Sequence, residues 1–552
     1  MQLNQYLSFF PSGLQDNLDS ALQNIEKNQV LPRLWRHDHT LWAPSPDQIS
    51  NRLDWLELPS IMSAELDSLT NFAQELPGLG FSSMVLLGMG GSSLAPEVFK
   101  KVFGPQPGFL DLLVIDTTDP VAIRKVSDSL DLTKSLFIVA TKSGGTVETL
   151  SLFKYFYHLL DADPAISKVG SHFIAITDPG SKLEQLAAEF NFRKIFLNNP
   201  NLGGRYSALS HFGLVPAASL GLDLSKILKE ATSASGQNSP LTPPAQSPAA
   251  QLGALIAAGF IAGRDKLTFI SNPEIASFSD WIEQLIAEST GKSGKGILPV
   301  VGEPIPSDLS LYGDDRIFVL QQLGHSATIS TLAVRLKQAG FPVIESQIQD
   351  PHQLGNLILT WQIATAIAGH LIGIQPFDQP DVESAKIAAR QSVQTYHETG
   401  MLPECVVEKA SAKKIDQFLI GVENSDYIAL QAYLPPFPEI EAVFRQIQAK
   451  LRDKHKLAVT FGFGPRFLHS TGQLHKGDRG NGYFIQFITP PPSDLAIPDQ
   501  AGRPESKITF GTLKQAQALG DGAALEAQGR KLLVINLDDP VLNSLTELKE
   551  SL

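Results

Sequence analysis

Short runs of aliphatic residues alternate with longer segments of helical periodicity, and this alternation most constrains the fold of the chain. In the first part of the sequence, such runs occupy residues 84–88, 111–116, 136–140, 173–177 and 194–197. Runs that are apolar throughout are typical of strands buried on both faces, with helices connecting one parallel strand to the next. The pattern predicts a doubly wound parallel α/β sheet over roughly residues 50–225.

The same alternation starts twice more along the chain. A second set of predicted strands lies at 267–271, 296–301, 316–320 and 341–346, with long helices at 351–373 and 380–398, and a third set lies at 427–434, 456–461, 483–488 and 531–537. A Ser/Pro-rich stretch at 233–248 predicts an exposed connection, and the Pro-rich stretch at 489–504 predicts a surface excursion. We therefore expect three parts: residues 1–225 (a helical segment and the first sheet), 226–400 (the second sheet) and 401–552 (a smaller C-terminal α/β unit).

Composition excludes several classes of protein. The 552 residues include 44 Lys and Arg against 57 Asp and Glu, a net charge of −13, which argues against a nucleic-acid binder. A single cysteine, Cys405, excludes an internal disulfide and a cysteine-based zinc site. The longest apolar stretches are far shorter than the ~20 residues of a membrane span, and the first residues do not resemble a signal peptide. A cytoplasmic protein without membrane or nucleic-acid partners is expected.

Glycines and hydroxyl groups follow the first predicted strand in the sequence GMGGSSLAP, residues 88–96. Ligands of open parallel sheets bind beyond the carboxyl ends of the strands, so this loop is a candidate binding element. Its spacing differs from G-x-G-x-x-G at Ser93, and Asp116 stands near the end of the next strand. A dinucleotide site, a plain tight turn and a contact to phosphate or sugar therefore remain open.

Two further loops carry donors for an anion. TKSGGTVET, residues 141–149, places glycines, hydroxyls and a lysine directly before a predicted helix, which favours a monophosphate site over simple capping by Ser143 or Thr146. It lacks the order of a nucleoside triphosphate loop. GGRYSALS, residues 203–210, adds Arg205, a planar cation that is either functional or solvated.

Three more segments hold candidate catalytic groups. Glu288 ends an amphipathic helix beside a Gly/Ser/Lys loop, where the helix dipole raises its pKa, so it is either a general base or a solvated glutamate. Gln379 and Lys386 are about two helical turns apart, and a surface lysine is the alternative. The polar cluster at 463–477 includes His469 and His475.

Taken together and in this order, these motifs resemble the glucose-6-phosphate isomerase family, whose members contain two sugar-isomerase (SIS) domains. The resemblance covers roughly residues 80–390. Residues 33–46 (RLWRHDHTLWAPSP) and the segment GPRFLHSTGQLHKG resemble more specifically the isomerase half of transaldolase/glucose-6-phosphate isomerase fusions, although no transaldolase half is visible.

The resemblance implies a role for each matching residue. Glu288 would move the proton between C1 and C2, Arg205 would stabilise the enediolate, and Lys386 would assist ring opening. Gln379 would contact the ligand. The sugar and its phosphate would be held by Gly91, Ser92, Thr141, Lys142, Ser143 and Thr146.

One departure from the family pattern concerns a histidine. The family places a histidine soon after the base glutamate, often reaching the neighbouring subunit's site, but residues 307–316 of this chain contain none. We expect His469 to replace it, with His475 in reserve. Whether the histidine acts in its own subunit or across a homodimer stays open at this point.

The implied reaction is the isomerisation of glucose 6-phosphate to fructose 6-phosphate through an enediolate, with a small sugar phosphate as the only ligand. This chemistry requires no cofactor, and no metal-ligand spacing appears in the sequence. Alternatives are a dual glucose/mannose-6-phosphate isomerase, an isomerase of another sugar phosphate, a regulatory sugar-phosphate-binding module and a dinucleotide-dependent oxidoreductase.

Overall fold

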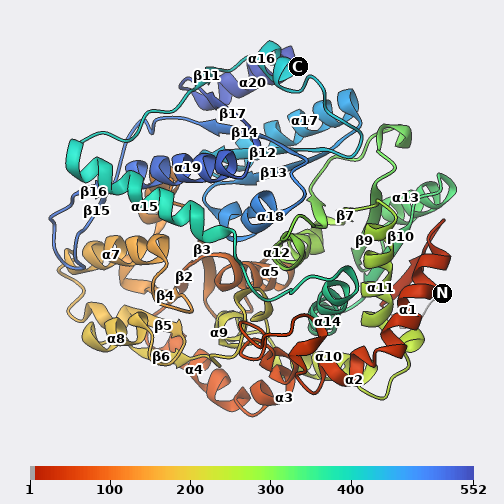
Figure 1. Cartoon of the computed structure of the whole chain (residues 1–552). Coiled ribbons are helices and arrows are strands. Elements are labelled where there is room, and N and C mark those ends of the chain that lie inside the picture. The colour runs from red at the N-terminus through yellow and green to blue at the C-terminus, as the bar shows by residue number, and fades with distance from the viewer. Residues whose placement is uncertain (1–5) are drawn as a thin grey trace.

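Three five-stranded sheets, parallel apart from one antiparallel edge strand, organise the chain in the computed structural model, which describes residues 6–552 (Figure 1). Their orders are β3-β2-β4-β5-β6, β8-β7-β9-β10-β1 and β13-β12-β14-β17-β11. In each sheet the strand that begins the crossover unit (β2, β7 or β12) lies between the two strands that follow it in the chain. The predicted doubly wound architecture is therefore confirmed. All three units share the arrangement of four parallel strands and differ in the fifth, edge strand, which follows the other four in the chain in the first sheet (β6) and precedes them in the other two (β1 and β11).

The first sheet is covered by helices on both faces and contains every strand predicted for it. Its central strand β4 is buried along its whole length, as expected for an uninterrupted aliphatic run. The strands are β2 (Ser83–Gly88), β3 (Asp111–Ile115), β4 (Ser135–Ala140), β5 (Phe173–Thr177) and β6 (Lys194–Leu197). The helices are α4 (Leu66–Gly78), α5 (Leu94–Phe103), α6 (Pro120–Ser129), α7 (Val147–Asp161), α8 (Lys182–Glu189) and α9 (His211–Ser219).

The N-terminal segment contributes to the second sheet. Strand β1 (Leu7–Phe10), which the sequence analysis did not predict, pairs antiparallel with β10 at the edge of that sheet. Helices α1 (Gln15–Lys27), α2 (Val30–Leu34) and α3 (Leu58–Ser63) follow it. The N-terminal segment thus adds an edge strand to the second sheet before the chain enters the first unit.

The second sheet contains the four predicted strands and the two predicted long helices. Its strands are β7 (Lys266–Ser271), β8 (Leu298–Val301), β9 (Arg316–Leu323) and β10 (Val343–Ile348). The helices are α10 (Leu224–Gln237), α11 (Pro248–Ile261), α12 (Ala276–Thr290), α13 (Ala327–Gln338), α14 (Leu354–Ile372) and α15 (Val382–Thr399). The expected exposed connection at 233–248 is wrong at its start, because α10 continues to Gln237.

The third sheet has five strands like the others. They are β11 (Glu408–Lys409), β12 (Tyr427–Tyr433), β13 (Ala458–Phe463), β14 (Gly482–Ile488) and β17 (Lys531–Asn536), with helices α16 (Ala412–Phe418), α17 (Pro438–His455), α18 (Gly472–Gly477), α19 (Phe510–Ala527) and α20 (Val541–Ser551). The Pro-rich stretch includes strand β15 (Ala496–Ile497), which pairs with β16 (Ile508–Thr509). It is not a free excursion, since Leu495 and Ile497 are buried in the core around α7.

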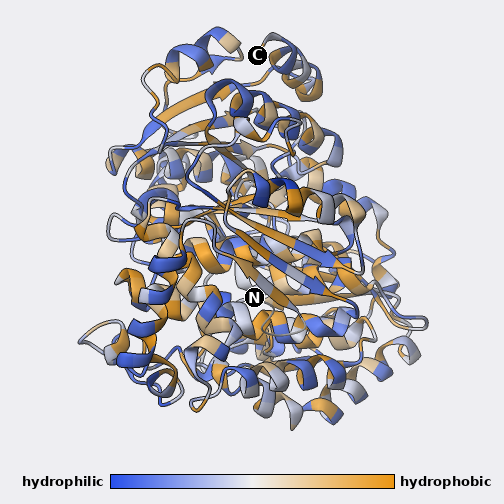
Figure 2. Ribbon diagram, turned by 90° about the vertical axis from the view of Figure 1, so that its right-hand side faces the viewer, coloured by the Kyte–Doolittle hydropathy of each residue, from blue (hydrophilic) through white to orange (hydrophobic). Residues whose placement is uncertain are grey.

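Apolar strands form the interior of the molecule, and polar residues dominate the outer faces of the helices (Figure 2). Helix α12 lies at the junction of the three units, where it packs against α5, α14 and α18. Helix α15 continues from the second unit and packs along α19 of the third. Among the described residues, none of the helices combines the length and apolar character needed to cross a bilayer.

Candidate active site

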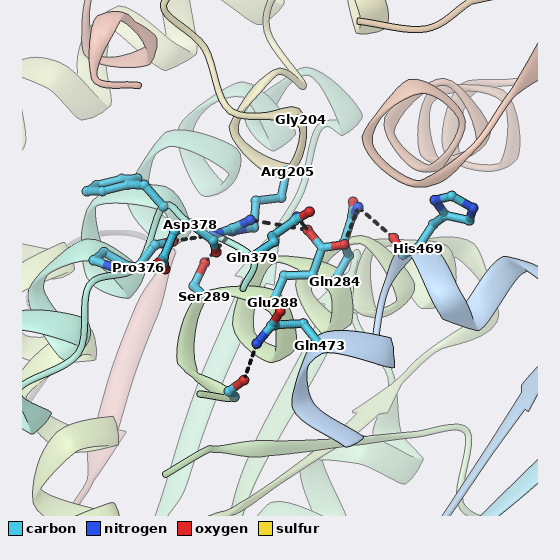
Figure 3. Close-up of polar contacts among 12 residues, drawn as sticks. Gly204, Arg205, Gln284, Glu288, Ser289, Pro376, Asp378, Gln379, His469 and Gln473 are labelled. Atoms are coloured by element: carbon cyan, nitrogen blue, oxygen red, sulfur yellow. Dashed lines mark hydrogen bonds and ion pairs between the residues drawn. The ribbon is translucent and has the colours of Figure 1, made fainter. Parts of the chain in front are cut away.

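Glu288 lies near the carboxyl end of α12 and is only 4% exposed. Its Oε2 accepts a hydrogen bond from Nε2 of Gln379 at 2.6 Å and pairs with Nη1 of Arg205 at 3.3 Å, while Oε1 accepts from Nε2 of Gln284 at 3.3 Å (Figure 3). Burial raises the pKa of this carboxyl group, and the Arg205 charge opposes the rise. The alternative of a solvated glutamate is wrong, and desolvation rather than the helix end is the main cause of the raised pKa.

Arg205 is as deeply buried as the carboxylate, with 2% of its surface exposed. Its Nε donates to Oγ of Ser289 at 2.8 Å, and its Nη2 donates to the carbonyl oxygens of Pro376 and Asp378. Because Nε, Nη1 and Nη2 each have a partner, the planar guanidinium is held in one orientation. The alternative of a solvated loop arginine is therefore wrong, since Arg205 is buried and paired with Glu288.

Close backbone approaches explain the glycines of the first loop. A Cβ atom on Gly91 would lie 2.1 Å from the carbonyl oxygen of Gly204, and one on Gly90 would lie 2.7 Å from that of His469. Ser92 is half-buried beside them in the short turn at residues 90–92. The loop after β2 thus meets both the Arg205 loop and a segment of the third unit.

His469 reaches the first unit from the turn at residues 466–469 of the third. Its Nε2 lies 2.9 Å from Oε1 of Glu148, and its backbone carbonyl accepts from Nε2 of Gln284 at 2.8 Å. Gln284 therefore connects the His469 backbone to the Glu288 carboxylate, with the imidazole ring on the side away from Glu288 (Figure 3).

Glu148 is a site residue that sequence reasoning missed. It lies in the first turn of α7, 4% exposed, and its pKa is lowered: burial acts to raise it, but the charge and hydrogen bond of His469 prevail. In the neutral form of the ring, an ionised carboxylate at Nε2 favours the tautomer with its proton on Nε2, which leaves Nδ1 able to accept a proton. The only signal in the sequence was a carboxylate within the TKSGGTVET motif.

The hydroxyl-rich loop before α7 is arranged differently from a simple helix cap. Thr146 makes no capping hydrogen bond, and its Oγ1 lies 2.8 Å from Oγ1 of Thr141. Ser143 accepts a hydrogen bond from the amide of Gly145 at 3.3 Å. Lys142 turns away, because its ammonium group pairs with Asp178 and donates to the carbonyl of Pro200 at 2.9 Å.

A cavity of about 680 Å³ opens between α7, α15 and the third unit. Of the predicted site residues, its walls include Ser143, Thr146, Lys386 and His469. Lys386 is exposed there, and its closest carboxylate is Glu383 at 4.0 Å. The remaining predicted residues do not form its wall: Gly91, Ser92, Thr141, Lys142, Arg205, Glu288 and Gln379.

The structure also bears on the reserve candidates. His475 is buried against Phe467 and Phe484, and this burial lowers its pKa well below the usual range. Asp116 is engaged by Nη1 of Arg466 at 2.9 Å and by Ser93, so it is not free to bind a ribose.

Within residues 6–552, three ligand-type side chains lie close enough to share a metal ion only at His37, Asp54 and Glu57. None of the three lines the cavity beside His469.

The part of the site that precedes residue 297 matches a known family, whereas Gln379, Lys386 and His469 lie beyond that match. A family model described as phosphoglucose isomerase matches residues 75–296, which include the Arg205 loop and Glu288. The glucose-6-phosphate isomerase of Synechococcus elongatus is 28% identical over 418 residues, covering 67% of this chain and 76% of that protein. That of Citrifermentans bemidjiense is 26% identical over 443 residues, covering 69% and 81%.

Solved structures show the same fold. A hypothetical protein from Thermus thermophilus superposes with a TM-score of 0.60 at 24% identity, covering 70% of this chain and 99% of that one. A glucose-6-phosphate isomerase from Chlamydia trachomatis gives a TM-score of 0.58 at 19% identity, covering 69% and 86%. The chain is thus similar in sequence to phosphoglucose isomerases, most clearly over residues 75–296, and it shares the fold of these two solved structures.

Proposed function

We propose that this chain isomerises glucose 6-phosphate to fructose 6-phosphate, with Glu288 as the base that moves a proton between C1 and C2. The observation that carries the proposal is the buried Glu288–Arg205 pair. A carboxylate with a raised pKa accepts and returns a proton near neutral pH, and general base catalysis of this kind contributes about 10²–10⁴-fold. A module that only senses a sugar phosphate has no use for such a base.

The remaining groups support a division of roles along the site. The hydroxyls of Ser143 and Thr146 and the N-terminal end of α7 are suited to the phosphate, which supplies binding energy away from the reacting carbons. Arg205 lies where negative charge develops on the enediolate. Gln379 donates a hydrogen bond to Oε2 of Glu288 in this structure. When C1 and C2 of the sugar approach this oxygen, the Gln379 side chain either moves away or remains hydrogen-bonded beside them.

Ring opening is assigned to His469 and Glu148. The Nε2–carboxylate hydrogen bond orients the imidazole, and Nδ1 is then available to exchange a proton with the ring oxygen or the anomeric hydroxyl. Lys386 lies on the same cavity wall and adds positive charge near these groups. Because Glu148 and His469 belong to one chain, the proposal has His469 acting in its own subunit. The proposed reaction takes place in the cytoplasm and uses no cofactor.

The deciding experiment is a coupled assay of glucose 6-phosphate conversion by wild-type protein and by Glu288→Gln. We expect kcat to fall by at least about 100-fold. Binding of glucitol 6-phosphate, an open-chain analogue, should remain within a few-fold of wild type. Glu283→Gln is the matched control, because Glu283 lies on the same helix but lines a different cavity.

Near-wild-type turnover of Glu288→Gln would show that Glu288 is not the base. An equal loss in Glu283→Gln would show that the helix, and not the carboxylate, was damaged. Running mannose 6-phosphate in parallel measures the epimer preference.

A further inference from the structure

Helix α19 of the third unit reaches the same carboxylate that holds His469. Nε2 of Gln517 donates to Oε1 of Glu148 at 2.7 Å, and the Nε2 of His469 lies 2.9 Å from the same oxygen. Glu148 is therefore shared by two donors, one from each of two segments of the C-terminal unit. Gln517 is 4% exposed and lies on the wall of the cavity.

The carboxylate of Glu148 determines the orientation of the Gln517 amide, because an ionised carboxylate accepts hydrogen bonds and cannot donate them. On the other side of the amide, Oε1 accepts a hydrogen bond from Oγ1 of Thr118 at 2.8 Å, and turning the amide over would place this oxygen against the carboxylate. Thr118 follows β3 in the first unit. The donor to Glu148 is thus fixed at both ends of the amide.

A buried ion pair fixes the helix that carries Gln517. Nζ of Lys514, one turn earlier on α19, lies 2.7 Å from Oδ2 of Asp119, and both side chains are almost completely buried. Oδ1 of Asp119 caps α6 through the amides of Val121 and Ala122. Since α19 is tied to the first unit beside Gln517, the amide has little freedom to move away from Glu148.

We propose that Gln517 is a positioning residue for the ring-opening pair: it keeps Glu148 ionised and correctly oriented, and thereby orients His469. This inference rests on the proposed function, which assigns no role to Gln517. The physical reason is that a hydrogen bond to a carboxylate favours the ionised form and fixes one oxygen lone pair. Gln517 makes no contact with the reacting carbons in this assignment.

The test compares Gln517→Leu with wild type and with Gln515→Leu, a control on the same helix. The first measurement is the titration of the Glu148 carboxyl group by ¹³C NMR, assigned by its absence in Glu148→Gln. We expect this titration to move to higher pH in Gln517→Leu, because the ionised form has lost a donor, and to stay unchanged in Gln515→Leu.

The second measurement separates ring opening from proton transfer. Turnover of cyclic glucose 6-phosphate should fall about tenfold in Gln517→Leu, the size expected when one hydrogen bond to a charged group is lost. Turnover of 5-deoxyfructose 6-phosphate should not change, because that sugar lacks the C5 hydroxyl and has its C6 oxygen phosphorylated, so it cannot close a ring. The acid limb of kcat for the cyclic sugar should move in the same direction as the Glu148 titration.

Thr118→Val provides a milder second variant, which frees the amide without changing α19. It should shift the Glu148 titration in the same direction as Gln517→Leu. An unchanged titration in both variants would overturn the positioning role, as would equal losses on the cyclic and the open-chain sugar. The NMR result is independent of turnover, so a failure of the proposed function would leave this test intact.

Discussion

The pKa of the Glu288 carboxylate is set by its burial and by two neighbouring side chains. Burial raises its pKa, while the charge of Arg205 and the hydrogen bond from Gln284 lower it. A glutamate in water is almost fully ionised at neutral pH and is a poor proton acceptor. The raised pKa makes Glu288 a better base, and the neighbouring cation keeps enough of it ionised to act.

Replacing Gln379 by leucine tests this balance. Gln379 donates to Oε2 of Glu288 at 2.6 Å, and a donor to the ionised form lowers a carboxyl pKa, so its loss raises the pKa of Glu288 further. A base must be ionised, so activity is present above its pKa and is lost as the pH falls through it. The acid limb of kcat should therefore move to higher pH, with activity near pH 6 falling about tenfold more than activity near pH 8.

The pH profile of kcat, measured over pH 5–9, checks this prediction. Gln391→Leu is the control, because Gln391 is exposed on α15 and outside the cavity wall. A profile that fell equally at all pH values would show that Gln379 contributes to binding or packing without adjusting the base.

At the level of elements, the site depends on how closely two loops approach each other. A Cβ atom on Gly91 would lie 2.1 Å from the carbonyl of Gly204, whereas a Cβ on Gly204 would meet nothing within 4 Å. Gly91→Ala should therefore displace the Arg205 loop and cost about 1–3 kcal/mol of stability, and Gly204→Ala should cost little. Thermal unfolding and turnover measurements check both variants. We expect Gly91→Ala to lower both the melting temperature and kcat. Equal melting temperatures in the two variants would contradict the close approach.

Strands and crossover helices were predictable because a buried parallel strand must be apolar along its whole length. Strand β1 was not, since it has four residues of which two are buried and is recognisable only once β10 lies beside it. The Ser-rich end of α10 was misjudged for a similar reason. Asn238 accepts hydrogen bonds from Ser247 and from the amide of Ala249, so polar residues there connect two helices instead of facing solvent.

For the site, the local patterns marked Glu288, at the end of a helix, and Arg205, in a glycine-rich loop, as candidates, and the family resemblance implied their roles. Local pattern was not enough for Glu148 and Gln517, whose partners are 321 and 369 residues away in the sequence. Neither residue is unusual in its own segment. Their roles follow from the docking of the third unit on the first, which no local pattern encodes.

At the scale of the whole molecule, the third unit is fixed to the other two by buried charges. Arg316 of the second sheet pairs with Glu303 at 2.8 Å and donates to the carbonyl of Leu457, while Glu303 accepts from the amide of Val459. Removing one member of such a pair leaves an uncompensated buried charge, which costs about 3–5 kcal/mol. This docking fixes the place from which His469 enters the site.

A mixing experiment asks whether one chain supplies a whole site. Glu288→Gln and His469→Ala each remove one essential group, and the structure has both groups in the same chain, connected through Gln284. We therefore expect the two variants, co-expressed and purified together, to show no more activity than the average of the two alone. Were His469 to serve a neighbouring subunit, half of the sites in each mixed dimer would have neither defect, restoring about a quarter of wild-type activity. A mixture of wild type with Glu288→Gln, which should retain activity in proportion to its wild-type content, calibrates the measurement.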